Sequence, residues 1–184
     1  ADGLALLATG STALPYRYAL KELNPFAIVG NNTLYAPHNQ NGELDLYDRV
    51  TSSGSITDGW LQDRAAFLNE KVRAYQADIN EILRPEYGPG NRKQYVDLAS
   101  GERITLSNAT LPIASASASQ IVFGGDVSNV MNGYSQADRL YGEGGADYLR
   151  GRLNNDTLEG GRGMDVYEYV GRKSVTGVLT NDGE

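Results

Sequence analysis

A nine-residue period near the C-terminal end constrains this chain more than any other feature. Four aspartates recur at this spacing, and four glycines recur in step with them. An apolar or aromatic residue stands two places after each aspartate. The glycines are Gly133, Gly142, Gly151 and Gly160, the aspartates are Asp138, Asp147, Asp156 and Asp165, and the apolar residues are Leu140, Leu149, Leu158 and Tyr167. The segment therefore repeats the nonapeptide Gly-Gly-x-Gly-x-Asp-x-U-x, where U is apolar.

These repeats resemble the RTX (repeats-in-toxin) hemolysin-type calcium-binding family. The resemblance covers residues 124–168, about a quarter of the 184-residue chain. It implies a short right-handed parallel β-roll, in which two repeats make one turn. The glycine-rich residues bend, and the triplet around the apolar residue is extended with that side chain turned inward. One sheet would carry Val122, Leu140 and Leu158 inward, and the other Met131, Leu149 and Tyr167.

Stacking of the repeats brings each aspartate near the aspartate two repeats on, together with backbone carbonyls of the same loops. Such an all-oxygen site suits Ca²⁺ better than Mg²⁺ or Zn²⁺. The family pattern pairs Asp138 with Asp156 and Asp147 with Asp165, and a weaker third pair joins Asn129 to Asp147. We therefore expect the Ca²⁺ ligands among Asp138, Asp147, Asp156, Asp165, Asn129, Gly142, Gly144, Gly151 and Gly160.

The repeats depart from the pattern at several glycine positions. Gln136 and Asn154 stand at the fourth position, and Tyr134, Glu143 and Arg152 at the second. Asn tolerates left-handed backbone angles, whereas Gln136 is expected to strain its loop. We expect two well-formed sites and a weaker third. The alternative is a solvated Gly/Asp-rich loop without metal.

Composition agrees with a calcium-binding, secreted protein. The formal net charge of −7 and a pI near 4.7 disfavour nucleic acid as a partner. The chain has no cysteine, so it has neither disulfides nor a thiolate metal site. No apolar run approaches the ~18 residues of a membrane span. The resemblance implies an extracellular or cell-surface location, reached by Gram-negative type I secretion.

The sequence before the repeats predicts an α+β N-terminal domain of unknown family, residues 1–113. An Ala/Ser linker, residues 114–120, would precede the calcium-binding roll, residues 121–184; alternatively, its small residues continue the roll as a strand. One long amphipathic helix is expected over residues 58–83, packed on its own domain or acting as a coiled-coil partner. Its apolar stripe consists of Leu61, Ala65, Leu68, Val72, Tyr75, Ile79 and Ile82.

Residues 95–98 and 103–106 predict a hairpin across residues 99–102. Because the open end of a short roll needs a cover, we expect the helix or this hairpin to cap the first turn near Val122 and Met131.

The sequence gives little sign of catalysis. His38 is the single histidine, and neither a His-Glu-x-x-His helix nor a Gly-x-Ser-x-Gly elbow is present. We therefore expect a non-enzymatic module of a larger secreted protein, such as a cytolysin, adhesin or lipase, whose partners are calcium ions and the rest of the parent polypeptide. Two alternatives remain: a lipase-like hydrolase fragment with His38 in a cleft beside a carboxylate, or an adhesive ligand-binding domain with an exposed aromatic patch.

Overall fold

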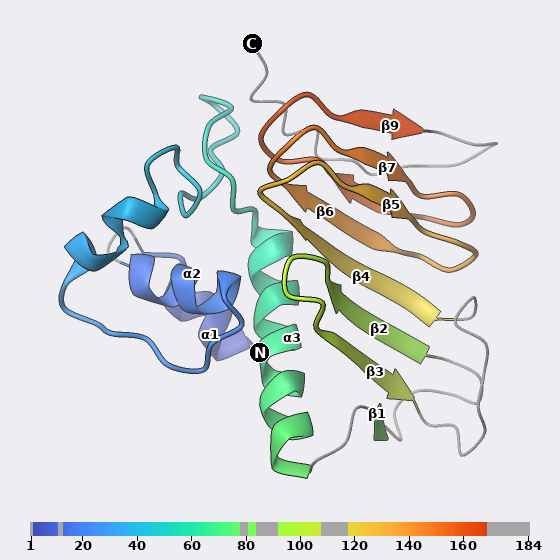
Figure 1. Cartoon of the computed structure of the whole chain (residues 1–184), viewed down its shortest axis with the longest axis horizontal. Coiled ribbons are helices and arrows are strands. Elements are labelled where there is room, and N and C mark those ends of the chain that lie inside the picture. The colour runs from blue at the N-terminus through green and yellow to red at the C-terminus, as the bar shows by residue number, and fades with distance from the viewer. Residues whose placement is uncertain (1, 11–12, 78–80, 84–91, 108–117, 169–184) are drawn as a thin grey trace. The chain divides into compact units, whose positions relative to one another are not determined.

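The computed structural model describes residues 2–10, 13–77, 81–83, 92–107 and 118–168. It divides the chain into two compact units, Ala1–Asp78 and Ile79–Glu184 (Figure 1). The N-terminal unit is built from helices, which are α1 (Asp2–Ala8), α2 (Leu14–Lys21), the 3-10 helix η1 (Asn32–His38) and α3 (Asp58–Ala77). Among the described residues, no helix is both long and apolar enough to cross a membrane.

The buried guanidinium of Arg17 joins the end of α1 and the turn after it to the loop that contains Leu44. Its Nε donates to the carbonyl of Ala8 at 2.8 Å, its Nη1 donates to that of Leu44 at 2.7 Å, and its Nη2 donates to that of Gly10. Burial lowers the pKa of Arg17, and the nearby charge of Asp45 opposes this shift. The carbonyls therefore satisfy a cation that would be costly to bury alone.

A second buried arginine, Arg64, comes from α3 and ties this helix to the end of α2. Its Nε donates to the carbonyl of Leu20 at 2.9 Å, and its Nη2 donates to that of Lys21. Its guanidinium also lies 5.8 Å from the ring centres of both Trp60 and Phe67. A cation at the C-terminal end of a helix interacts favourably with the helix dipole, so α2 and α3 are joined by both packing and charge.

Helix α3 is shorter than the sequence predicted. It ends at Ala77, and residues 81–83 form a β-strand instead of the last helical turn. The first half of the predicted stripe is buried at Leu61, Ala65 and Leu68, whereas the side chain of Tyr75 is 84% exposed. The prediction was wrong at the C-terminal end because residues 81–83 pair with a strand of the C-terminal unit, which sequence periodicity does not reveal.

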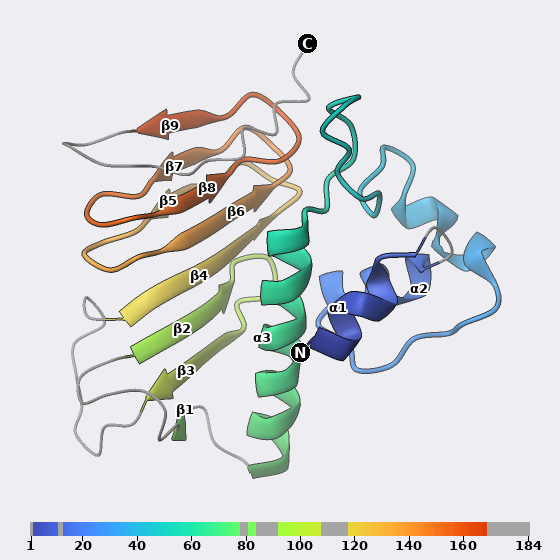
Figure 2. The same cartoon turned by 180° about the vertical axis from the view of Figure 1, so that it is seen from behind.

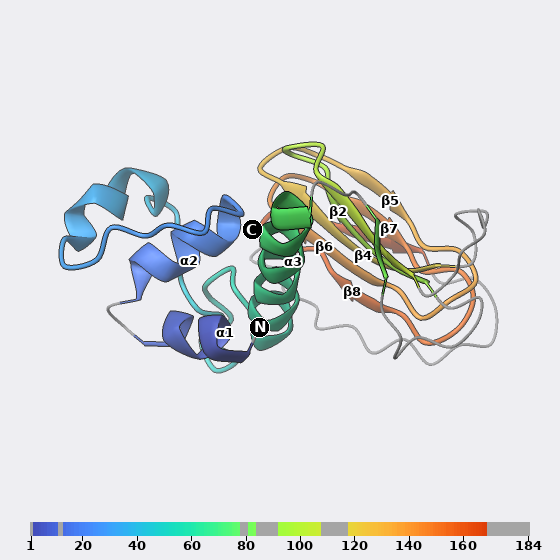
Figure 3. The ribbon, with the colours of Figure 1, turned by 90° about the horizontal axis from the view of Figure 1, so that it is seen from below.

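The C-terminal unit contains two sheets (Figure 2). The larger has the strand order β1-β3-β2-β4-β6-β8, and the smaller has the order β5-β7-β9. Figure 3 shows β5 and β7 on one side and β6 and β8 on the other. The strands are β1 (Glu81–Leu83), β2 (Arg92–Asp97), β3 (Arg103–Ser107), β4 (Ala118–Gly125), β5 (Val130–Asn132), β6 (Arg139–Glu143), β7 (Tyr148–Arg150), β8 (Thr157–Glu159) and β9 (Val166–Glu168).

The repeats form parallel ladders in which each residue pairs with the residue two repeats on. Val122 pairs with Leu140 and Leu140 with Leu158 in one sheet. Met131 pairs with Leu149 and Leu149 with Tyr167 in the other. These inward residues pack together as one core, with Tyr167 against its edge. The predicted distribution of inward side chains is thus confirmed, and the parallel strands are consistent with a β-roll.

The predicted hairpin is confirmed, and it extends the larger sheet. Strands β2 and β3 pair antiparallel, and β2 pairs in parallel with β4. Val96 of β2 joins the core formed by the repeats. Strands β1–β3, which the sequence assigned to an N-terminal domain ending at residue 113, therefore belong to the C-terminal unit.

At its C-terminal end, the expected Ala/Ser linker is a strand, which was the alternative given for these residues. Residues 118–120 begin β4, where Ala118 pairs with Arg92 and Ser119 with Lys93. Main-chain hydrogen bonds form a strand here regardless of how small the side chains are. Residues 114–117 lie outside the described part of the chain.

The core predicts a clear difference between two substitutions in neighbouring strands. Leu149 is fully buried in β7, so Leu149→Ala is expected to lower the free energy of unfolding by about 2–5 kcal/mol. Val130 on β5 is 71% exposed, so Val130→Ala serves as a control and is expected to cost about 0.5 kcal/mol or less. Urea denaturation in the presence of Ca²⁺ measures both, and equal losses would contradict the assignment of Leu149 to the core.

Candidate metal centre

The glycine-rich segments of the repeats form two stacks of loops. Three loops stack on one side of the roll, at residues 124–129, 142–147 and 160–165, and two on the other, at residues 133–138 and 151–156. In the last three loops along the chain, the second and fourth residues have left-handed backbone angles: Glu143 and Gly145, Arg152 and Asn154, Gly161 and Gly163. Asn154 thus adopts the angle expected of it. Gln136 does not adopt a left-handed angle, so the strain expected at this residue is absent and its loop has a different backbone conformation.

A repeated hydrogen bond joins each loop to the loop two repeats earlier. The Oδ1 atom of Asp147 accepts from the backbone N–H of Asn129 at 2.7 Å, and the Oδ1 atom of Asp165 accepts from that of Asp147 at 2.9 Å. On the other side, the Oδ1 atom of Asp156 accepts from the backbone N–H of Asp138 at 3.0 Å. One oxygen of each of these carboxylates therefore serves the backbone of the preceding turn.

The second oxygen has a different environment. Oδ2 of Asp147, Oδ2 of Asp165 and Oδ1 of Asn129 are buried and have no hydrogen-bond partner among the described residues. A buried oxygen without a partner costs about 1–3 kcal/mol. These three atoms belong to the stack of three loops.

The first glycine of each repeat faces a side-chain oxygen of its own loop. A Cβ atom added to Gly142 would collide with Oδ2 of Asp147 and with the carbonyl oxygen of Gly160. A Cβ atom on Gly124 would meet Oδ1 of Asn129 and the carbonyl oxygen of Gly142 in the same way. Side-chain and carbonyl oxygens thus face the same space, which is the donor chemistry that Ca²⁺ prefers.

The Asp138–Asp156 pair is less well arranged for binding a cation than the aspartates in the stack of three loops. Both side chains are buried, and the backbone N–H of Asp138 donates to Oδ1 of Asp156, but Oδ2 of Asp138 accepts a hydrogen bond from the backbone N–H of Tyr134 at 2.9 Å. Gly133 and Gly151 still face Asp138 and Asp156, respectively. In the loop 133–138, which has no left-handed residue, the second aspartate oxygen therefore accepts a hydrogen bond. The corresponding oxygens of Asp147 and Asp165 accept none.

Gly144 lies in different surroundings from the other predicted glycines. A Cβ atom there would come within 3.3 Å of Nη2 of Arg162 and 3.5 Å of Oδ1 of Asp126. Arg162 and Asp126 form an ion pair at 3.4 Å that spans the stack of three loops. The sequence analysis missed this pair, since neither residue follows the repeat pattern. The predicted ligands also leave out Gly124 and Gly133, although Gly133 was assigned to the nine-residue period.

Burial raises the pKa of both Asp138 and Asp147 to about 6, from an ordinary value of 3.8. Backbone hydrogen bonds oppose this shift, and neighbouring carboxylates add to it. Burial also raises the pKa of Asp165. The neighbouring carboxylates are Asp156 for Asp138, and Asp165 and Glu143 for Asp147. Without a cation, the folded loops thus disfavour the charges that they hold.

No three His, Asp or Glu side chains of the described residues are grouped closely enough to hold a metal ion by themselves. A cation in these loops would therefore need backbone carbonyls in addition to one or two carboxylates. The carbonyl of Gly142 lies near Oδ1 of Asn129, and that of Gly160 lies near Oδ2 of Asp147, so both carbonyls are placed to bind a cation together with these side chains.

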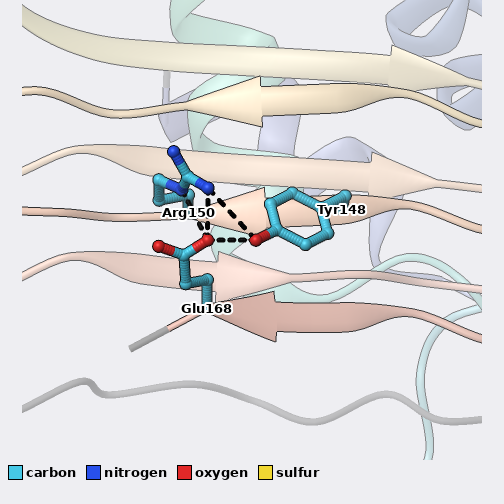
Figure 4. Close-up of polar contacts among 3 residues, drawn as sticks. All are labelled: Tyr148, Arg150 and Glu168. Carbon is cyan, nitrogen blue, oxygen red and sulfur yellow. Dashed lines mark hydrogen bonds and ion pairs between the residues drawn. The ribbon is translucent and has the colours of Figure 1, made fainter. Parts of the chain in front are cut away.

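A second polar cluster lies on β7 and β9 (Figure 4). The Tyr148 hydroxyl donates to Oε2 of Glu168, and Nε of Arg150 donates to the same atom at 2.7 Å. These contacts lower the pKa of Glu168, the Tyr148 hydrogen bond having the larger effect. All three groups are satisfied by one another, so the cluster joins two strands and offers no metal site.

His38 does not show the arrangement that a hydrolase fragment would need. Its side chain is exposed, and its ring lies 4.7 Å from the ring of Tyr18. Among the described residues, no carboxylate is hydrogen-bonded to it. The structure thus offers His38 an aromatic contact rather than a catalytic partner.

Comparison with known families agrees with this geometry. Residues 123–158 and 132–167 match the family model described as "RTX calcium-binding nonapeptide repeat (4 copies)". No curated protein and no solved structure matches the chain. The C-terminal part of the chain therefore contains RTX calcium-binding nonapeptide repeats, and RTX nonapeptide repeats bind Ca²⁺. Such repeats are a structural module that is not itself catalytic, typically found in secreted proteins.

The raised pKa values predict that the effect of pH on stability changes sign with Ca²⁺. In excess EGTA, the folded state binds protons at Asp138 and Asp147 more tightly than the unfolded chain does. Stability is therefore expected to rise as the pH falls from about 7 toward about 5, and to be lost as the pH rises through about 6. In Ca²⁺, protons compete with the ion, and the same change should destabilise the repeats. The β signal in circular dichroism, followed against pH in each condition, tests this without requiring the repeats to be folded in EGTA at pH 7, and the same direction of change in both conditions would contradict it.

Proposed function

We propose that this chain is a non-catalytic calcium-binding module of a larger secreted protein, and that its repeats fold into a right-handed β-roll when they meet Ca²⁺ outside the cell. The observation that carries the proposal is the repeated meeting of an unsatisfied side-chain oxygen with a glycine carbonyl, as at Asp147 and Gly160. Calcium-binding is the property of the repeats themselves; the toxin, adhesin or lipase nature of the parent protein is part of the proposal.

Asp147 and Asp165, with the carbonyl of Gly160, would hold the best-formed site. Both loops have left-handed residues at the second and fourth positions, and both aspartates keep an oxygen without a hydrogen-bond partner. Asn129 and Asp147, with the carbonyl of Gly142, would hold a second site in the same stack.

Asp138 and Asp156, beside Gly151, would form a third site after the hydrogen bond between Oδ2 of Asp138 and the backbone N–H of Tyr134 is broken. When bound, Ca²⁺ supplies the positive charge that these buried carboxylates lack.

The energetics favour folding that depends on calcium. Ordering the ~45 residues of the repeats costs about 1–2 kcal/mol of backbone entropy per residue. The strands β5, β7, β8 and β9 are three residues long, and their shared core is small. Because ion binding is coupled to folding in such modules, binding contributes the missing free energy. A chain that stays unfolded at the low Ca²⁺ of the cytosol also suits export by Gram-negative type I secretion.

A calcium titration tests this switch. We expect the repeats to be unfolded at ~10⁻⁷ M Ca²⁺, the range of intracellular sensors, and folded at ~10⁻³ M, the range of extracellular modules. Circular dichroism should show β signal gained with Ca²⁺ and lost with EGTA. The same β signal in excess EGTA as in millimolar Ca²⁺ would refute calcium-dependent folding.

The stack of three loops predicts a ranking among aspartate variants. Asp147 belongs to two of the proposed sites, whereas Asp138 and Asp165 belong to one each. Asp147→Ala is therefore expected to weaken Ca²⁺ binding more than Asp138→Ala or Asp165→Ala, measured by calorimetry. Asp58→Ala is a control, since Asp58 is an exposed residue of α3 in the N-terminal unit, outside the loops of the repeats. Equal losses at positions 138, 147 and 165 would argue against stacked sites.

A further inference from the structure

The N-terminal unit contains a cavity of about 690 Å³ beside the C-terminal halves of α2 and α3. This volume lies within the range of about 300–1,000 Å³ that is typical of small-molecule sites. The rings of Tyr18, Phe26 and Tyr75 line it, together with the aliphatic side chains of Leu23 and Val72. Val72 and Tyr75 belong to the apolar stripe that the sequence predicted to face a core, and here they face this cavity.

Two of the rings are exposed to an unusual extent. The side chain of Phe26 is 81% exposed and that of Tyr75 is 84% exposed. The backbone that carries Phe26 is nevertheless anchored on both sides. Oδ1 of Asn24 accepts from the backbone N–H of Phe26 at 3.0 Å, and the Tyr35 hydroxyl donates to the carbonyl of Ile28 at 2.9 Å. A contiguous exposed apolar surface rimmed by polar residues is typical of a ligand-binding groove.

The end of α2 directs the chain into the cavity wall. The backbone N–H of Asn24 donates to the carbonyl of Ala19 at 2.8 Å, and that of Leu23 to the carbonyl of Leu20 at 3.1 Å. This pair of bonds ends a helix with a left-handed residue, and in helices that end this way the left-handed residue is usually glycine. Leu23 has a φ of 45° and is 2% exposed. The left-handed leucine therefore both fixes the exit of residues 24–26 and forms a buried part of the wall.

The polar side chains that line the cavity carry both kinds of hydrogen-bonding group. Asn24 and Gln76 contribute amides, Glu22 a carboxylate and Lys71 an ammonium group. The one negative and one positive charge leave the lining formally neutral. Donors and acceptors together match hydroxyl groups, which both donate and accept.

We propose that this cavity is a carbohydrate-binding site that holds a neutral pyranose ring. The C–H face of the sugar packs on the exposed rings of Phe26 and Tyr75, and its hydroxyls bond to the amide and carboxylate groups. An acyl chain fits less well, because it would cover the lining amide and carboxylate groups without bonding to them. The site lies wholly within the N-terminal unit, so it does not depend on the calcium sites of the repeats.

Nuclear magnetic resonance on the full chain in ~1 mM Ca²⁺ tests the proposal. The probes are methyl α-D-glucopyranoside, methyl α-D-mannopyranoside and methyl β-D-galactopyranoside. At least one is expected to shift the backbone amides of Glu22, Asn24 and Gln76 in a saturable manner. Tyr75→Ala should weaken that binding about fivefold, the size expected for loss of one ring contact, whereas Tyr75→Phe keeps the ring and should bind nearly as wild type.

Matched glutamine variants separate the site from general effects on α3. Gln76→Ala removes a lining amide and should weaken binding, whereas Gln62→Ala removes an exposed glutamine of the same helix outside the cavity and should not. Three results would overturn the proposal. They are the absence of saturable shifts with all three pyranosides, unchanged affinity in Tyr75→Ala, and saturable shifts at these amides with octanoate but with none of the sugars.

Discussion

The hydrogen bond from a backbone N–H to the aspartate two repeats later is the interaction on which the C-terminal unit depends. It joins successive turns whose strands are too short to be stable by pairing alone. The same bond uses one carboxylate oxygen and buries the other beside a glycine carbonyl. The residues that assemble the turns are thus the residues that require a cation, which couples the architecture to ion binding.

The two units bury charge in opposite ways. In the N-terminal unit, Arg17 and Arg64 are buried cations, and carbonyls at the ends of helices and loops satisfy them. In the C-terminal unit, Asp138, Asp147 and Asp156 are buried anions, and backbone N–H groups satisfy only part of their demand. The partners of these cations come from the chain itself. The buried anions need an external cation in addition, so calcium is expected to act on the repeats first.

Much of the repeat structure could be predicted from residue spacing. The nine-residue period placed Leu140 and Leu149 inward on different sheets, and the left-handed tolerance of Asn154 was correctly inferred. The bond from Tyr134 to Asp138 could not be predicted, because it depends on the shape that one loop takes when glycine is missing. The ion pair of Arg162 and Asp126 joins residues separated by a whole loop, and no local pattern connects them.

The sequence by itself determined the register of the repeats, their inward residues and the oxygen chemistry of their loops, since all three follow from a strict local period. Only the tertiary structure decided where α3 ends, because the pairing of residues 81–83 with β3 outweighed the helical periodicity. It alone also decided that β2 continues the sheet of the repeats and that Tyr75 stays exposed. These outcomes depend on contacts between segments distant in sequence, whose free energies no local pattern contains.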